Sequence, residues 1–242
     1  MLHENIHYSN PYFYFRIMNI YLTSILLFLI SFFCTTAYSQ QAPQGWFIYF
    51  GNTKINKSKF SIHHELQLRD HQVFGDHNQT LFRLGLQYEV LPWLSITNGY
   101  GYIHSESRGE PNNPFRENRI YQEALAKQTA GRFMLRHRLR LEERFIEDQD
   151  FRGRGRYVFF ADLPLTTLKM QENTIYASFY NEVFINLFQD DHIKTFDRNR
   201  LYIGAGYKIR NNLGMQLGYM RQHVGSSKGT NHILLSLHHQ IN

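Results

Sequence analysis

Cysteine, tryptophan and proline are scarce in this sequence, and long apolar runs are almost absent from it. Its 242 residues include one cysteine, two tryptophans and six prolines. The single cysteine, Cys34, lies beside the apolar run 20–33, so a chain shortened past that point has no disulfide or thiol chemistry. No run after Phe33 approaches the roughly 20 apolar residues that a membrane-spanning helix needs. These absences exclude a disulfide scaffold and a helical membrane protein.

The N-terminal region has the pattern of a cleavable export signal. The apolar run 20–33 is followed by small residues, which predicts cleavage after Ser39. Residues 1–39 are therefore interpreted as a leader and signal peptide, with Met18 as the preferred start. Lipidation of Cys34 is not expected, because a phenylalanine precedes it where a lipoprotein signal has a small residue.

Beyond residue 59 the sequence alternates between apolar and polar residues. From Phe60 to Leu68 the even positions are apolar except for one histidine, and the odd positions from Ser61 to Arg69 are polar. This period of two is typical of a strand with one apolar and one polar face. The 20 phenylalanines and 16 tyrosines suit a barrel that needs apolar surface and interfacial aromatic side chains. We predict an all-β fold, a closed antiparallel transmembrane β-barrel in the outer membrane with about ten strands, or alternatively twelve. The ten strands are expected over 60–69, 79–90, 94–105, 117–127, 132–146, 154–164, 174–187, 196–208, 213–224 and 231–241.

Two classes of connection alternate between these strands. Short ones lie near 91–93, 128–131, 165–173 and 210–212, and longer polar ones lie near 70–78, 106–116, 147–153, 189–195 and 225–230. In outer-membrane barrels short turns face the periplasm, longer loops face outside, and single bacterial chains have even strand counts. Both termini are therefore expected in the periplasm, with 60–242 as the barrel and 40–59 as a rim segment or partial strand. The expected partners are outer-membrane lipid and the barrel-assembly machinery.

Charged residues lie on the polar face of the predicted strands. In the strand 132–146, Leu139 points one way, and Arg136, Arg138 and Arg140 point the other. A charge at the centre of a lipid-facing surface costs about 2–4 kcal/mol, so these side chains are expected in the lumen, where each needs a partner. The expected lumen charge network comprises Glu65, Arg69, Arg83, Glu89, Glu117, Arg119, Arg136, Arg138, Arg140, Glu142, Arg144, Arg154, Arg156, Glu182, Arg198 and Arg200.

Two interpretations of this network stay open. In a narrow barrel, arginines and carboxylates on facing strands can plug the lumen, which is a structural role. The alternative is a cationic pathway or a site for an anionic solute or lipid. The formal net charge of +6 fits either role. A nucleic-acid partner is not expected, because no nucleic-acid-binding module is recognisable.

Small barrels also include lipid hydrolases and acyltransferases, which need a histidine and a serine at the rim. His104 with Ser105 or Ser107 is the nearest approach to such a pair, although its spacing differs from His-x-Ser. His63 and His238 lie on the first and last predicted strands, so closure of the barrel would bring them side by side. A packed histidine is favoured there over a metal ligand, and neither a metal site nor a cofactor is expected.

Several stretches of the chain together resemble one family. They are Glu117-Asn118-Arg119 with Tyr121-Gln122, Leu139-Arg140-Leu141-Glu142-Glu143-Arg144, Arg154-Gly155-Arg156-Tyr157, Asn181-Glu182-Val183-Phe184, Asp197-Arg198-Asn199-Arg200, Gly204-Ala205-Gly206-Tyr207 and Leu217-Gly218-Tyr219-Met220. In these motifs, from about Trp46 to the C-terminus, the sequence resembles domain-of-unknown-function family 2490. The resemblance implies an exported barrel of Bacteroidota-type bacteria and implies no activity. We therefore expect a non-enzymatic outer-membrane barrel, either structural or a narrow channel. The alternatives are a rim lipid hydrolase or acyltransferase, and a soluble periplasmic lipid-binding barrel.

Overall fold

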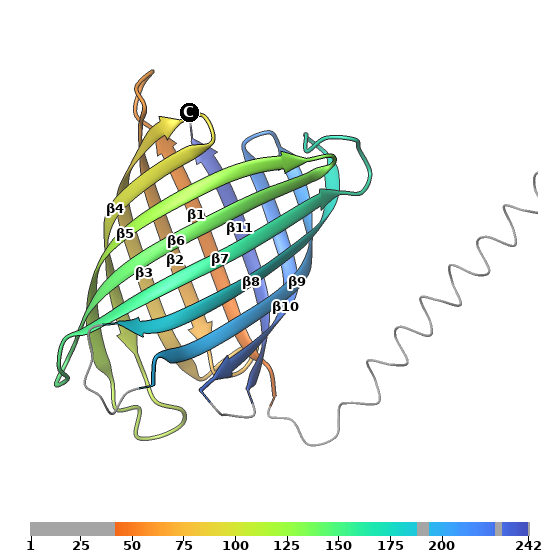
Figure 1. The fold of residues 1–242 in the computed structure, drawn as a ribbon. Helices are drawn as coiled ribbons and strands as arrows, with labels where there is room; N and C mark the ends of the chain where they lie inside the picture. The colour runs from red at the N-terminus through yellow and green to blue at the C-terminus, as the bar shows by residue number, and fades with distance from the viewer. Residues whose placement is uncertain (1–41, 188–193, 226–228, 242) are drawn as a thin grey trace, which may run out of the picture. The chain divides into compact units, whose positions relative to one another are not determined.

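Eleven strands closed into one barrel make up the described part of the chain (Figure 1). A computed structural model describes residues 42–187, 194–225 and 229–241, so the expected leader, residues 1–39, lies outside the described residues. The strands are β1 (Gln44–Lys54), β2 (Phe60–Asp70), β3 (His77–Leu91), β4 (Leu94–Ser105), β5 (Phe115–Ala130), β6 (Phe133–Ile146), β7 (Arg152–Pro164), β8 (Thr174–Leu187), β9 (Phe196–Arg210), β10 (Leu213–Val224) and β11 (Thr230–Ile241). Within these described residues there is no helix long and apolar enough to cross a membrane.

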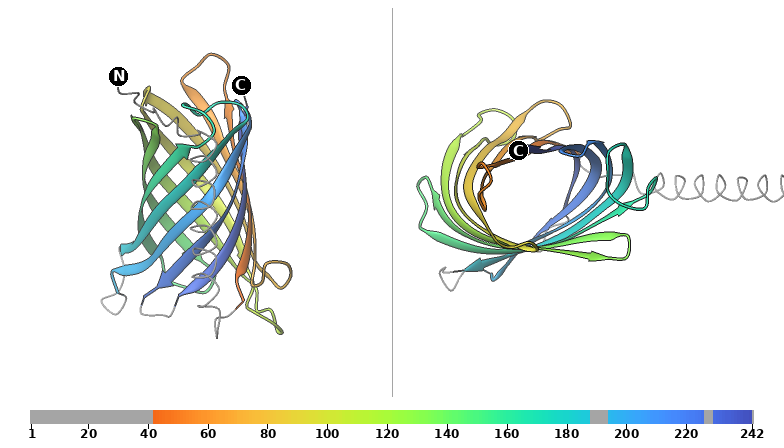
Figure 2. Two further views of the ribbon diagram at one scale, coloured as in Figure 1. Left: turned by 90° about the vertical axis from the view of Figure 1, so that its right-hand side faces the viewer. Right: turned by 90° about the horizontal axis from the view of Figure 1, so that it is seen from above.

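The barrel closes through its first and last strands. β1 runs antiparallel to β2 and parallel to β11, so Phe47 pairs with Leu68 on one side and with Leu235 on the other. The other neighbouring strands pair antiparallel in chain order. Seen from above in Figure 2, the strands enclose a central lumen. The closed, largely antiparallel β-barrel predicted from the alternation is confirmed.

The strand count is eleven rather than ten or twelve, and β1 accounts for the difference. All ten predicted strands are present, with ends shifted by up to three residues. The segment 40–59, interpreted as a rim segment or partial strand, instead contains a complete strand of 11 residues. The expectation of an even strand count was wrong because it assumed that every neighbouring pair is antiparallel. The parallel pairing of β1 with β11 closes a barrel with an odd count, and it also separates His63 on β2 from His238 on β11.

The two ends of the barrel differ in their connections. At one end, called here the short-turn end, lie the two-residue turns 92–93, 131–132 and 211–212, the connections 55–59 and 165–173, and the end of β11. The opposite end, called here the loop end, carries the other five connections and the start of β1. Figure 1 shows the short-turn end at the top, beside the C-terminus. Successive connections lie at alternate ends of the barrel, as predicted. The connection 165–173 was predicted to be short, but it has nine residues between β7 and β8.

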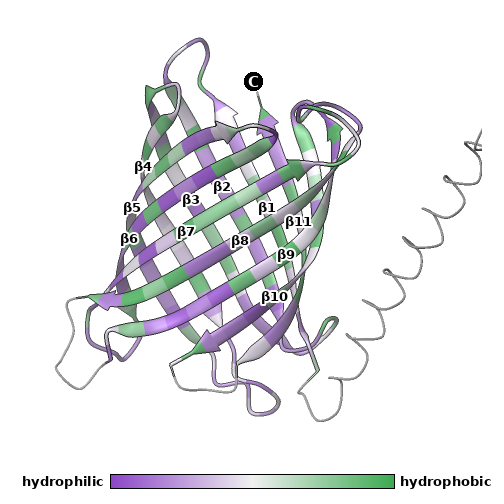
Figure 3. Ribbon diagram, turned by 45° about the vertical axis from the view of Figure 1, so that its right-hand side comes forward, coloured by the Kyte–Doolittle hydropathy of each residue, from purple (hydrophilic) through white to green (hydrophobic). Residues whose placement is uncertain are grey.

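Alternation places apolar side chains outside the barrel and charged ones inside. On β6, Leu139 and Leu141 are 59% and 54% exposed, whereas Arg140 and Glu142 between and beside them are 2% and 1% exposed. Figure 3 shows the same alternation of hydrophobic and hydrophilic residues along many of the strands. Because the lumen is narrow, its side chains bury one another, and the interior of this barrel is made largely of paired polar groups.

Glycines make room for tyrosine rings that lie against the inner wall. A Cβ atom on Gly99 would lie 2.4 Å from Cζ of Tyr121, and one on Gly218 would lie 2.5 Å from Cε2 of Tyr202. Any larger residue at these positions would collide with the ring, and the aromatic ring in turn covers strand backbone that glycine leaves bare. This accounts for the glycine in the Leu217-Gly218-Tyr219-Met220 motif.

One side of the lumen is apolar, and β1 supplies much of it. The cluster contains Trp46 and Ile48 of β1, Tyr202, Met220 and Leu234, with Phe50 and Tyr180 packed against it. β1 therefore contributes to the core as well as to closure. The charged residues occupy the rest of the lumen.

Candidate functional site

Carboxylates bound by several arginines at once fill the middle of the lumen. Glu142 of β6, whose side chain is fully buried, has one oxygen 2.6 Å from Nη1 of Arg156 and the other 2.5 Å from Nη2 of Arg154. Arg83 and Arg140 each place a guanidinium nitrogen 3.8 Å from the same carboxylate. Four arginines from three strands, β3, β6 and β7, thus converge on one acid, because inward positions at the same height in a narrow barrel meet across the lumen.

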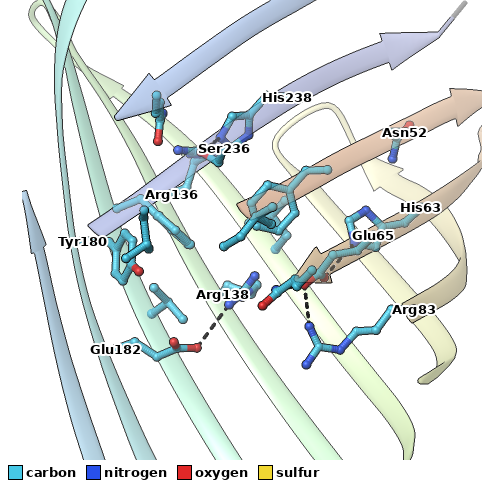
Figure 4. A pocket seen from close by; sticks show the side chains of 18 of the residues that line it. Asn52, His63, Glu65, Arg83, Arg136, Arg138, Tyr180, Glu182, Ser236 and His238 are labelled. Carbon is cyan, nitrogen blue, oxygen red and sulfur yellow. Dashed lines mark hydrogen bonds and ion pairs between the residues drawn. The ribbon is translucent and has the colours of Figure 1, made fainter. Parts of the chain in front are cut away.

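Glu182 of β8 forms a second centre of the same kind. It accepts hydrogen bonds from Nε and Nη2 of Arg156, from Nη2 of Arg138 at 3.2 Å and from Nη1 of Arg200 at 3.4 Å. Figure 4 shows the pair Arg138–Glu182 on one side of the cavity, with Glu65 paired to Arg83 at a distance from it. Since Arg156 bridges Glu142 and Glu182, the two centres belong to one network.

Arg140 connects this network to β5. Its Nε and Nη2 lie 2.7 Å and 2.5 Å from Oε2 of Glu123, and its guanidinium carbon lies 4.6 Å from the ring centroid of Tyr121. Both contacts come from the inward face of β5, which pairs directly with β6. Arg140 is 2% exposed, so an ionic partner and an aromatic ring replace the water it would otherwise bind.

Glu117 and Asp197 hold the arginines nearest the loop end. Both oxygens of Glu117 accept from Arg119, at 2.6 Å and 2.8 Å, and from Arg144, at 2.5 Å and 3.0 Å. Asp197 accepts from Arg198 at 3.1 Å and 3.0 Å and lies 3.5 Å from Nη1 of Arg154. Two-pronged contacts of this type fix both the distance and the plane of each guanidinium.

Most residues of the expected lumen network form ion pairs inside the barrel. Fourteen of its sixteen residues contact an oppositely charged side chain within the lumen. Glu89 does not: it lies at the short-turn end, its side chain is half exposed, and its partner is Lys54 at 3.9 Å. Arg69 has no carboxylate within 4.0 Å among the described residues, and its guanidinium donates to the amide oxygens of Gln67 and Gln79 instead.

Three acids that complete the network were not among the predicted residues. Glu123 and Asp162 lie at inward-facing alternate positions of β5 and β7. Counting every second residue along these strands would therefore have found them. Asp197 could not be found this way, because it is the extra residue of a β-bulge. Phe184 pairs with Arg198 and the next residue, Ile185, pairs with Phe196, which leaves Asp197 between them and breaks the alternation.

Two aromatic side chains gather arginines around them. The guanidinium carbons of four arginines lie 4.6 to 5.8 Å from the ring centroid of Phe184, and they belong to Arg154, Arg156, Arg198 and Arg200. Trp46 is contacted by Arg69 at 3.8 Å and by Arg200 at 4.9 Å. The ring faces attract cations but carry no net charge, so they order these arginines without neutralising them.

The network lies between two cavities. One, of about 280 Å³, extends toward the short-turn end and is lined by residues that include Asn52, His63, Arg136 and His238 (Figure 4). The other, of about 180 Å³, extends toward the loop end and is lined by residues that include Gln79, Ser105, Glu117 and Arg144. Arg69, Arg83, Arg156 and Arg200 line both cavities, which places these arginines at the division between them.

The candidate rim serine and histidine are not brought together. Ser105 is 3% exposed on the inward face of β4, where its hydroxyl accepts a hydrogen bond from Nε2 of Gln79 at 2.7 Å. His104 is its neighbour in sequence and therefore points to the opposite face, where Nε2 lies 3.1 Å from Glu106. Ser107 follows in the connection, and no hydrogen bond among the described residues joins it or Ser105 to His104.

The histidines of the cavity toward the short-turn end are packed rather than clustered. The ring of His238 stacks on Phe50 with a centroid distance of 5.0 Å, and its Nε2 lies 3.0 Å from the hydroxyl of Ser236. His63 lies two strands away, 3.7 Å from Glu65. The described residues contain no group of three or more His, Cys, Asp or Glu side chains that could hold a metal ion.

The fold and this lumen define a class of protein: a closed β-barrel whose interior holds a network of arginine–carboxylate pairs. Within that class, the chain belongs to the family described as "Protein of unknown function (DUF2490)", whose model matches residues 43–232. The match begins one residue before β1, so the family pattern includes the whole of β1. The resemblance inferred from the sequence motifs is confirmed. No curated protein matches the chain.

Proposed function

We propose that this protein is an integral outer-membrane β-barrel without enzymatic activity, whose ion-paired lumen holds it closed or nearly closed. The observation that carries the proposal is the apolar outer surface. Outward-facing side chains in the middle of the strands include Leu84, Leu86, Leu139, Ile203 and Leu217, each at least 47% exposed. A continuous apolar surface of this kind is unusual on a protein that faces water and suits one that faces lipid.

Aromatic side chains near the two ends of the barrel give further support. Each of the following is at least 40% exposed: Phe60, Trp93 and Phe133 toward the short-turn end, and Phe74, Phe145, Phe151 and Phe196 toward the loop end. Aromatic rings at both ends of an apolar band are the arrangement found at the two interfaces of a bilayer. The band and its flanking rings therefore fit a barrel that spans the membrane.

The two alternatives fit the same surface less well. A soluble lipid-binding barrel needs an apolar cavity inside and a polar surface outside, and here the two faces are reversed, with Leu139 outside and Arg140 inside. A rim lipid hydrolase or acyltransferase needs a histidine that contacts its serine, whereas His104 and Ser105 point to opposite faces of β4. The network of charges is then best explained as a structural plug.

The test combines fractionation with conductance. We expect the full-length protein to remain in outer membranes after an alkaline carbonate wash, and the refolded barrel to show little or no conductance in planar bilayers. Arg140→Ala removes the contacts to Glu123 and Tyr121 and should raise the conductance or lower the heat resistance. Release of the wild-type protein by carbonate would contradict the membrane location. A large, steady, ion-selective conductance of the wild type would contradict the plug and favour a channel.

A further inference from the structure

The cavity at the loop end has an unusual charge composition. Among the described residues, eight arginines and one carboxylate, Glu117, line its volume of about 180 Å³. Glu117 is already bound by both Arg119 and Arg144 through two-pronged contacts. Glu117 therefore has no oxygen left for the other arginines of the described lining. All of these except Arg69 contact carboxylates that lie outside the lining.

Arg69 is the clearest case of an arginine without a counter-charge. Its Nε donates to Gln67 at 2.8 Å and its Nη1 donates to Gln79 at 2.7 Å, and its guanidinium carbon lies 3.8 Å from the ring centroid of Trp46. These neutral groups orient the guanidinium and leave its charge unbalanced. Arg69 is partly buried, and a cation withdrawn from water and held by neutral partners is expected to attract an anion, because removing a charge from water without a counter-charge is unfavourable.

Arg200 contacts the same Trp46 ring as Arg69 and also has little carboxylate contact. Its guanidinium carbon lies 4.9 Å from the ring centroid of Trp46, and its Nε donates to Gln222 at 2.7 Å. Its carboxylate contact, to Glu182, is 3.4 Å long, and Glu182 is shared with Arg138 and Arg156. The cavity is therefore lined by two guanidinium groups that contact Trp46. Arg69 has no carboxylate partner among the described residues, and Arg200 has one long carboxylate contact that is shared.

We propose that the cavity at the loop end binds a phosphate group, held by Arg69 and Arg200. Guanidinium forks match the oxygens of a tetrahedral anion, and phosphate offers enough oxygens to bind two forks at once. Ser105 and Gln79, which also line the cavity, add neutral polar groups beside the arginines. The site requires the folded barrel and does not require the membrane location proposed above.

The fluorescence of Trp46 provides a measurement of binding, because its ring contacts both Arg69 and Arg200. The chain has two tryptophans, Trp46 and Trp93, and the latter lies in the turn between β3 and β4. In a Trp93→Phe background, the fluorescence of the detergent-refolded barrel reports on Trp46 alone. We expect titration with inorganic phosphate to change this fluorescence saturably, while chloride at the same ionic strength does not.

Variants test whether the change in fluorescence depends on the arginines. Arg69→Gln should weaken phosphate binding by about tenfold or more, as expected for the loss of one charge-assisted contact, and Arg69→Lys should weaken it less. The matched control is Arg136→Gln, which removes a lumen arginine that pairs with Asp162 and lines the other cavity. Retention of the heat-modifiable band on gels shows that each variant has folded.

A second titration separates the sources of phosphate. Inorganic phosphate is compared with a short-chain phosphatidic acid, with phosphatidylcholine of the same chain length as the control. Saturation by inorganic phosphate supports a site for a free anion, and tighter saturation by phosphatidic acid supports a site for a lipid headgroup. No response to either compound, or an equal response from Arg69→Gln, would overturn the site even if the barrel proved to be a membrane protein.

Discussion

At the residue scale, Glu142 illustrates how buried charge is tolerated in this lumen. Four arginines lie within 3.8 Å of its carboxylate, so its negative charge stabilises several cations that would otherwise be buried without a partner. Removing one member of a buried ionic cluster typically costs about 3–5 kcal/mol. Its sequence neighbour Glu143 points to the opposite face and has no part in the lumen.

We therefore expect Glu142→Gln to lower the free energy of unfolding by about 3–5 kcal/mol, because the amide keeps the shape and loses the charge. Glu143→Gln is the matched control and should change it by no more than about 0.5 kcal/mol, as surface substitutions usually do. Urea unfolding of the detergent-refolded barrel measures both. Similar values for the two variants would mean that the arginines are stabilised by something other than Glu142.

Leu139 gives the complementary prediction for the outer face. It is 59% exposed in the middle of β6, so in the proposed membrane location it contacts lipid. Leu139→Arg should block membrane assembly, since an arginine near the bilayer centre costs about 2–4 kcal/mol, whereas Leu139→Phe should assemble normally. Membrane fractionation with a heat-modifiability gel checks both. Equal assembly of the two variants would show that this face does not contact lipid.

At the element scale, the sequence predicted ten of the eleven strands and missed how the barrel closes. Alternation is a local pattern, and it marks each strand whether its neighbours are parallel or antiparallel. The pairing of Trp46 and its strand with β11 joins segments nearly 190 residues apart, and nothing local in the sequence reports it. Likewise, the inward position of Asp197 depends on a bulge, which shifts the parity by one residue. Residues of the candidate site could thus be predicted where inward and outward positions alternate regularly. They could not be predicted where a bulge interrupts that alternation.

The parallel pairing of β1 with β11 predicts which strands are neighbours where the barrel closes. Phe47 of β1 pairs with Leu235 of β11, and Leu68 of β2 lies on the far side of Phe47. In a Cys34→Ser background, cysteines at 47 and 235 should form a disulfide on mild oxidation, because paired Cα atoms lie within the roughly 4.4–6.8 Å that a disulfide spans.

Cysteines at 68 and 235 are the control pair for this experiment. β1 separates them, so they are two strand spacings apart, or about 9–10 Å, and they should not form a disulfide. A ten-stranded barrel, with β2 next to β11, would give the reverse result. Non-reducing gels of the folded protein decide between the two arrangements.

At the scale of the whole molecule, the odd strand count has a consequence for topology. In a barrel with an even count, the first strand begins and the last strand ends at the same end. Here β1 begins at the loop end and β11 ends at the short-turn end. If the barrel spans the outer membrane, these two points lie on opposite sides of it, and the expectation that both termini are periplasmic does not hold for the ends of the barrel itself.

Labelling of single cysteines tests this arrangement in intact cells. In the Cys34→Ser background, Ala42→Cys lies just before β1, Asp150→Cys lies in a loop-end connection and Lys57→Cys lies at the short-turn end; all three positions are exposed. Because long loops of outer-membrane barrels face outside, a membrane-impermeant maleimide should label positions 42 and 150 in intact cells and position 57 only after lysis. The informative comparison is between positions 42 and 57, since they are joined by a single strand. If both were labelled from the same side, β1 would not cross the membrane, and the barrel in the cell would have ten spanning strands.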